Sequence, residues 1–198
     1  MKRGKSGREG TRGGVSVWKG LAAGFAGGLA AAWTMNQFQT LLGRLMEGEE
    51  RAHGAQSLQK GSPRRGVGRA LARRGKDDPE DDAAARLAQA VAVEVFDREL
   101  TKQEKETGGA VAHYAMGAGT GAVYGALAEV LPEATAGFGL PFGAAVWAVA
   151  DEAVVPALGL SKSAKEYPLS IHAYALASHL VYGLTAEAVR RALRDALE

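Results

Sequence analysis

The chain has 198 residues, a formal net charge of +2 and no cysteine. This length is enough for one domain with a real core, and the absence of cysteine excludes a disulfide framework and thiolate chemistry. The small net charge does not point to a strongly acidic or basic partner, so the placement of the charges carries more information than their sum.

Apolar residues gather in four Ala- and Gly-rich stretches, near residues 20–42, 108–131, 137–160 and 168–189. About 20 apolar residues, rising 1.5 Å each, span the ~30 Å hydrocarbon layer of a bilayer. The sequence therefore predicts an all-α, integral membrane four-helix bundle, with one transmembrane helix at 17–42 and three more within 108–190. A soluble Ala-rich bundle is the alternative, because Ala and Gly favour insertion only weakly.

Basic residues concentrate in the tail at 1–16, which we expect to be disordered, and again at Arg190, Arg191 and Arg194, at and within the C-terminal tail at 191–198. An excess of Lys and Arg on short flanks marks the cytoplasmic side, so both termini are predicted to be cytoplasmic. A cleaved signal peptide ending near Ala30–Ala32 is a rival interpretation. It is disfavoured because the apolar run continues through Leu42.

Residues 43–107 form a hydrophilic connection between the first and second apolar stretches. Its Gly61–Arg69 part has the composition of a basic flexible linker. Small and apolar residues then recur at helical spacing, which predicts an amphipathic helix near 83–106 on the membrane surface or capping the bundle. The basic run at 64–76 lacks interleaved aromatics, so no nucleic-acid partner is expected.

Glycine recurs at every fourth position in the first and second apolar stretches. Small residues at this spacing make a flat stripe on which another helix can approach closely, so we interpret both stripes as packing seams. The stripes are Gly20, Gly24 and Gly28, and Gly117, Gly121 and Gly125. Large residues form a neighbouring ridge suited to lipid or to a facing groove, namely Leu21, Phe25, Leu29 and Trp33.

The segment Gly117–Ala122 formally satisfies the glycine fingerprint of dinucleotide-binding proteins. That fingerprint follows a β-strand and precedes an acidic residue about 20 positions later, and neither feature is present. We therefore expect no cofactor.

Asp151 and Glu152 lie inside the third apolar stretch, where a charge is costly and usually faces a partner or a water-filled cavity. At 1.5 Å per residue, this pair and His179 lie about 12–15 Å below the outer boundary. His113 and His172 lie about 5 Å below it. The sequence predicts an intramembrane polar cluster with the members Asp151, Glu152, His179, His172 and His113.

Pro156 follows Glu152 by four residues and has no N–H to bond its carbonyl, so we expect a kink and a free carbonyl oxygen beside the carboxylates. Adjacent carboxylates diverge by about 100° on a helix and cannot both face one partner. Nearer the inner end, Glu129 and Glu187 are predicted to pair with Arg190 and Arg191.

Three interpretations of the polar cluster remain open. It can be a structural lock that holds the helices in register, or a path for protons or cations. It can also be a metal site, although no tightly spaced pair of histidines supports one, and no metal is expected.

Short motifs in the second half carry a family resemblance. They are His113-Tyr114, Tyr124-Gly125, Ala128-Glu129, Pro132, Asp151-Glu152, Pro156, Gly159-Leu160, Ser178-His179, Tyr182-Gly183, Glu187 and Arg190-Arg191. On these residues, the chain resembles the YagU-like family of bacterial inner-membrane proteins over roughly 108–194. The first apolar stretch matches only in character, and the connection at 43–107 has no specific match. The resemblance implies an integral inner-membrane protein and adds no substrate or catalytic residue.

The sequence thus predicts a multi-pass protein of the bacterial inner membrane. We expect a non-enzymatic role, because no nucleophile elbow, Ser–His pairing or two-carboxylate cleft is visible. The expected partners are the lipid bilayer and further copies of the chain, since four spans are few for a transport pore. The sequence does not identify a small-molecule or ion ligand. A soluble or peripheral helical scaffold that acts through its glycine seams is the alternative.

Overall fold

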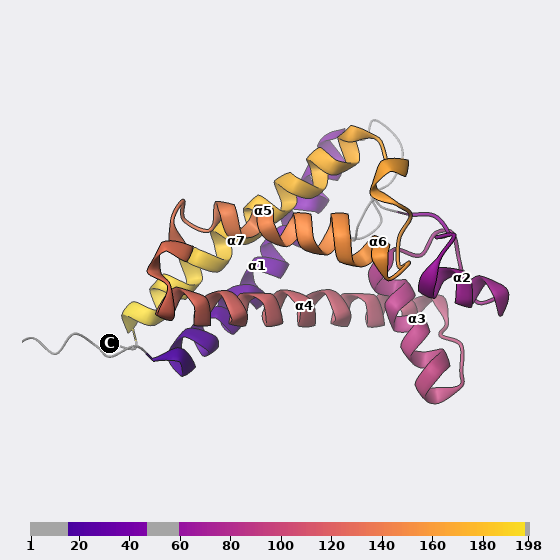
Figure 1. Cartoon of the computed structure of the whole chain (residues 1–198), viewed down its shortest axis with the longest axis horizontal. Helices are drawn as coiled ribbons and strands as arrows, with labels where there is room; N and C mark the ends of the chain where they lie inside the picture. Colours follow the sequence, from indigo (N-terminus) through magenta and orange to yellow (C-terminus); the bar gives the residue numbers. More distant parts are fainter. Residues whose placement is uncertain (1–15, 47–59, 197–198) are drawn as a thin grey trace, which may run out of the picture.

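The computed structural model describes residues 16–46 and 60–196, and in these ranges every regular element is a helix (Figure 1). The expectations for the tail at 1–15, for the stretch at 47–59 and for residues 197–198 lie outside the described residues. The helices and their bounds are α1 (Val17–Met46), α2 (Gly66–Arg73), α3 (Ala83–Phe96), α4 (Lys102–Val130), η1 (Pro132–Thr135), α5 (Leu140–Val149), η2 (Ala150–Val154), α6 (Val155–Ala157), η3 (Ala164–Glu166) and α7 (Leu169–Ala196).

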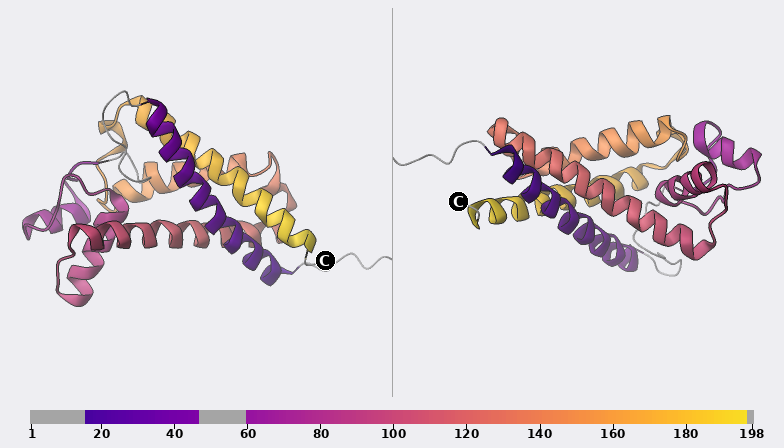
Figure 2. Two further views of the ribbon diagram at one scale, coloured as in Figure 1. Left: turned by 180° about the vertical axis from the view of Figure 1, so that it is seen from behind. Right: turned by 90° about the horizontal axis from the view of Figure 1, so that it is seen from below.

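Four long helical segments run alternately in opposite directions: α1, α4, the continuous segment from α5 to α6, and α7. Helix α1 packs along both α4 and α7, while α5 packs on α7 and α3 packs on α4. The start of α1 and the end of α7 lie at the same end of the bundle, and α2 and α3 lie at the opposite end (Figure 2). The fold is therefore a helical bundle with both described ends on one side.

One helical segment in the described ranges is long and apolar enough to cross a membrane. It is the 18-residue segment Leu140–Ala157, with a mean hydropathy of 1.3, of which only 11% is buried. The other three long helices do not reach this hydropathy, because Gly, Thr, Tyr, His and amide side chains interrupt their apolar residues and α4 begins with a charged turn. Composition and length thus identify one candidate span where the sequence analysis expected four.

The glycine stripes of α1 and α4 face each other. A Cβ on Gly24 would lie 2.8 Å from the Gly125 Cα, and one on Gly28 would lie 3.0 Å from the Gly121 Cα. A side chain has no room at these positions, so the two backbones are in direct contact. A second close approach joins α5 to α7, where a Cβ on Gly183 would lie 2.8 Å from the Gly143 N.

The described part of the connection between α1 and α4, from residue 60 onward, is folded against the bundle, so the prediction of a flexible linker at Gly61–Arg69 is wrong for its second half, which enters α2 (Gly66–Arg73). The first turn of α2 has unpaired amides, which need acceptors. The Val67 N–H donates to the Leu158 carbonyl at 3.0 Å, and the Gly68 N–H donates to the Gly159 carbonyl at 2.8 Å. These bonds attach α2 to the two residues that follow α6.

The amphipathic helix expected near 83–106 ends at Phe96, ten residues early. Asp97 takes the left-handed conformation with φ 48°, which ends α3. Thr101 then starts α4 with a capping box, in which its hydroxyl accepts from the Glu104 N–H and the Glu104 carboxylate accepts from the Thr101 N–H. Local capping therefore overrides the helical periodicity across this boundary.

We predict that Gly121→Ala destabilises the fold, because its Cβ would lie 2.6 Å from the Gly28 Cα. Overpacking of this kind costs about 1–3 kcal/mol. Gly119→Ala is the matched control on the same helix, since nothing lies within 4 Å of its Cβ. The control should be neutral or stabilising by up to about 1 kcal/mol, as expected for Ala in place of Gly in a helix. Thermal unfolding of the two variants measures the difference, and equal effects would contradict the close α1–α4 contact.

Candidate functional site

A single turn of π-helix positions the two carboxylates of the third apolar stretch. The Val155 N–H donates to the Ala150 carbonyl, five residues back, and the next residue, Pro156, has no N–H to continue the ladder. The sequence analysis expected a kink at Pro156, and the structure has a π turn over Ala150–Val154 directly before it. Such turns insert one extra residue and re-aim the side chains on either side.

Asp151 and Glu152 consequently face different partners. The Glu152 carboxylate lies 2.6 Å from His172 Nδ1, and the other ring nitrogen of His172 lies 3.0 Å from the Ala164 carbonyl. Asp151 Oδ2 lies 3.8 Å from His179 Nδ1. The predicted cluster of five residues is therefore divided: Glu152 and His172 form one pair, and Asp151 lies with His179 at a separate place.

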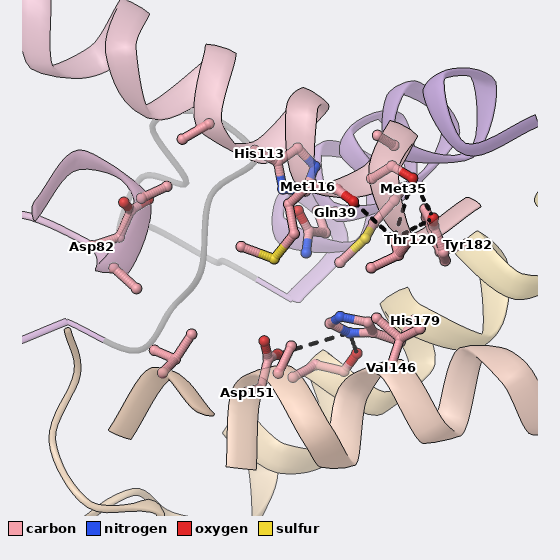
Figure 3. Close-up of a pocket in the computed structure, with 18 of the residues that line it drawn as sticks. Met35, Gln39, Asp82, His113, Met116, Thr120, Val146, Asp151, His179 and Tyr182 are labelled. Atoms are coloured by element: carbon pink, nitrogen blue, oxygen red, sulfur yellow. Dashed lines mark hydrogen bonds and ion pairs between the residues drawn. The ribbon is translucent and has the colours of Figure 1, made fainter. Parts of the chain in front are cut away.

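Asp151, His179 and His113 line a central cavity of about 130 Å³. Asp151 and His179 lie on one wall, and His113, Gln39 and Thr120 lie on the opposite wall (Figure 3). Most of the remaining lining is apolar, contributed by Ala32, Met35, Leu87, Met116, Val146, Val155, Leu160 and Ile171. The walls thus come from α1, α3, α4, the α5–α6 segment and α7.

The polar atoms of this cavity are only partly bonded to the protein. His179 Nδ1 lies 2.9 Å from the Ala175 carbonyl, which can only accept, so the proton is on Nδ1 and Nε2 of the neutral ring is an acceptor. The buried atoms His113 Nε2 and Gln39 Oε1 have no hydrogen-bond partner within the described part of the chain. Buried polar atoms are nearly always bonded, so a water molecule or another bound group in the cavity would complete the hydrogen bonding of these two atoms.

The folded connection closes one side of the cavity. Asp82 caps α3 by accepting from the Ala85 N–H at 2.8 Å, and it lines the cavity with Ala83, Ala84 and Leu87. Burial raises the pKa of Asp82, although the amides that it caps oppose this shift. The fully buried Arg86 fixes the position of α3, because its guanidinium donates to Asp77 Oδ1 and to the Leu160 carbonyl, both at 2.7 Å.

A second polar centre joins α4 to α7 at the end of the bundle that holds the described termini. The fully buried Glu187 accepts from the Tyr124 hydroxyl at 2.9 Å, from Arg190 Nε at 2.7 Å and from Arg191 Nε. Glu129 is instead paired with Arg194 and also accepts from the Ser16 N–H at 3.3 Å. The predicted partners of Glu187 lie beside it, whereas Glu129 is bound by an arginine that the sequence analysis had not paired with it.

Several polar residues of these centres were not singled out from the sequence. Gln39 is an isolated polar residue in an apolar stretch, which was a usable signal. Tyr124 entered only as part of a family motif, with no polar role assigned to it, and the Arg86–Asp77 pair depends on how the connection folds. Within the described ranges, no three His, Asp or Glu side chains are grouped as in a metal site.

A family model described as "Protein of unknown function (DUF1440)" matches residues 63–188 of the chain. The match covers more than half of the 198 residues. The chain belongs to the DUF1440 family. The DUF1440 match begins before α2 and ends within α7, so the folded connection is part of the family region, whereas α1 precedes it. Comparison with curated proteins and with solved structures gives no match.

We predict that Glu187→Ala lowers the free energy of unfolding by about 3 kcal/mol or more, because it leaves the buried Arg190 without its carboxylate. Glu133→Ala, at an exposed position in η1, is the control and should change stability by less than about 0.5 kcal/mol. Denaturant unfolding of both variants checks the difference. A change of similar size in the two would show that the Glu187 centre does not hold the helices together.

Proposed function

We propose that the protein is an integral membrane helical bundle that handles protons or cations at Asp151, in its central cavity. The observation that carries this proposal is the contrast between two kinds of polar group. The pairs that can hold helices together, Glu152–His172 and Tyr124–Glu187, lie outside the cavity, whereas the cavity retains a carboxylate, an imidazole and an amide oxygen that the described residues do not fully bond.

This contrast argues against a structural lock at Asp151. The Glu152–His172 contact joins η2 to α7 at 2.6 Å, and the Tyr124 hydroxyl joins α4 to α7 by donating to Glu187 at 2.9 Å, both within hydrogen-bond range. The Asp151–His179 separation of 3.8 Å is too long for a hydrogen bond. A group that is not needed for packing is free to take up and release a small cation or a proton.

The membrane proposal is supported by the exposure of large apolar side chains on the long helices. Examples on three different helices are Trp33, 57% exposed on α1, Val123, 58% exposed on α4, and Val149, 60% exposed on α5. Leu140–Ala157 is strongly apolar and scarcely buried, unlike the core helix of a water-soluble protein. Lipid would cover these surfaces, and glycine seams supply the helix contacts that membrane bundles use. On this basis we propose that all four long segments span the membrane.

We further propose a bacterial inner-membrane location with both termini cytoplasmic, and membership of the YagU-like group. Both described ends lie on one side of the bundle, where Lys19 and the arginines of α7 are also found, in agreement with a positive cytoplasmic side. The role is non-enzymatic and needs no cofactor. Net transport through so few helices would require several copies of the chain.

We predict that the protein stays in the membrane pellet after an alkaline carbonate wash of cell membranes. The physical reason is that the large apolar side chains exposed on the long helices would be covered by lipid and would otherwise face water. Western detection in pellet and supernatant measures the partition, with a known peripheral protein as the control. Recovery in the supernatant would support the alternative of a soluble or peripheral scaffold and overturn the membrane proposal.

We predict that proteoliposomes containing the protein take up protons under an imposed gradient, and that Asp151→Asn and His179→Ala reduce the rate at least about tenfold. A pH-sensitive dye inside the vesicles measures the uptake. Glu152→Gln is the matched control, since the adjacent carboxylate belongs to the His172 pair; it should retain uptake and lower thermal stability instead. Absence of uptake in the parent protein, or equal uptake in all variants, would contradict proton handling at Asp151.

A further inference from the structure

The unsatisfied polar groups of the central cavity are predominantly acceptors. Asp151 presents a carboxylate, Gln39 presents an amide oxygen with no partner among the described residues, and His179 holds a proton on Nδ1, which makes Nε2 an acceptor in the neutral form of the ring. The hydroxyl donors nearby are already used: the Tyr182 hydroxyl donates to the Gly117 carbonyl at 2.6 Å, and the Thr120 hydroxyl lies 2.8 Å from the Met116 carbonyl. A group that fits this site must bring hydrogen-bond donors and positive charge.

The walls of the cavity require an apolar body as well. Between the polar groups, the lining consists of Ala, Val, Leu, Ile and Met side chains. A strongly hydrated inorganic cation would place its water against these walls, whereas a short hydrocarbon chain would be stabilised by them. Met35 and Met116 have flexible, polarisable side chains that adapt to ligands of different shape.

The size of the cavity limits the ligand. Its volume is about 130 Å³, slightly smaller than an apolar cavity of roughly 150 Å³ that accepts benzene. An ammonium group with a hydrocarbon body of roughly four carbons fits this space. Such an amine is protonated at neutral pH, as the lysine side chain is.

We propose that the cavity binds a small organic ammonium ion, with its N–H groups directed to Asp151 and Gln39 and its hydrocarbon body against the apolar wall. This inference rests on the proposed function of Asp151 as a cation site and names the chemical class of the cation. The bound ion would satisfy the acceptors on both walls and so join α1 to the π turn across the cavity.

The test titrates n-butylammonium chloride into the full-length protein in detergent micelles, followed by calorimetry, with protein-free micelles as the blank. Two further probes separate the contribution of the ammonium charge from that of the hydrocarbon chain. 1-Butanol has the same chain without the charge, and sodium chloride supplies a cation without the chain. We expect saturable binding of n-butylammonium, and at least about tenfold weaker binding of both other probes. Equal binding of 1-butanol, or tighter binding of sodium, would overturn the proposal without the need for any variant.

Three variants locate the bound ion. Asp151→Asn removes the charge without changing the shape of the side chain and should weaken n-butylammonium binding at least about tenfold. Ala112→Phe fills the cavity from α4 without removing an acceptor and should weaken it similarly. Glu152→Gln changes the adjacent carboxylate, outside the cavity, and should leave the affinity within about twofold. Unchanged affinity in both cavity variants would overturn the proposal.

The two functional proposals can fail separately. Proton uptake without n-butylammonium binding would overturn the proposal that the cavity binds an organic ammonium ion, and it would leave the proton role of Asp151 standing. Binding without proton uptake would support the organic cation as the ligand of this site and overturn proton handling.

Discussion

Direct backbone contact between glycine-bearing helices is the constraint on which the rest of this structure depends. Because α1 and α4 meet through Gly24, Gly28, Gly121 and Gly125, no large side chain can lie between them. Large apolar residues next to the glycine stripes, such as Trp33 on α1 and Val123 on α4, are exposed on the outside instead. Beyond Gly28 and Gly117 the stripes end, and Met35, Gln39 and His113 line the central cavity instead. One packing rule thus produces both the apolar exterior and the internal space.

Polar groups are divided between two tasks according to where they lie. At the end that holds the described termini, Glu187 and Glu129 are saturated by arginines, a tyrosine and a backbone amide, which ties α1, α4 and α7 together. In the cavity, Asp151 and His179 stay 3.8 Å apart, and Gln39 Oε1 and His113 Nε2 have no hydrogen-bond partner among the described residues. The strong pairs stabilise the bundle, so the weakly paired groups are available for a ligand.

Much of the helical architecture follows from local patterns, and the differences have physical causes. Apolar stretches of suitable length predicted the four long segments, and glycine spacing indicated which faces of α1 and α4 could pack closely. The connection was harder to predict, because its α2 depends on carbonyls supplied by Leu158 and Gly159, about 90 residues away along the chain. The early end of α3 depends on one left-handed residue, Asp97, which a periodic pattern does not reveal.

By itself, the sequence determined that the protein is helical, that its glycines recur at packing intervals and that costly carboxylates lie in an apolar segment, because composition and spacing are local properties. Only the tertiary structure decided the partner of each carboxylate. A π turn sends Glu152 to His172 and Asp151 to the cavity, and Glu129 meets Arg194 through the packing of α4 against α7. These pairings depend on the direction in which side chains point across helix interfaces. That direction is set by packing contacts between residues far apart in the sequence, so local patterns do not reveal it.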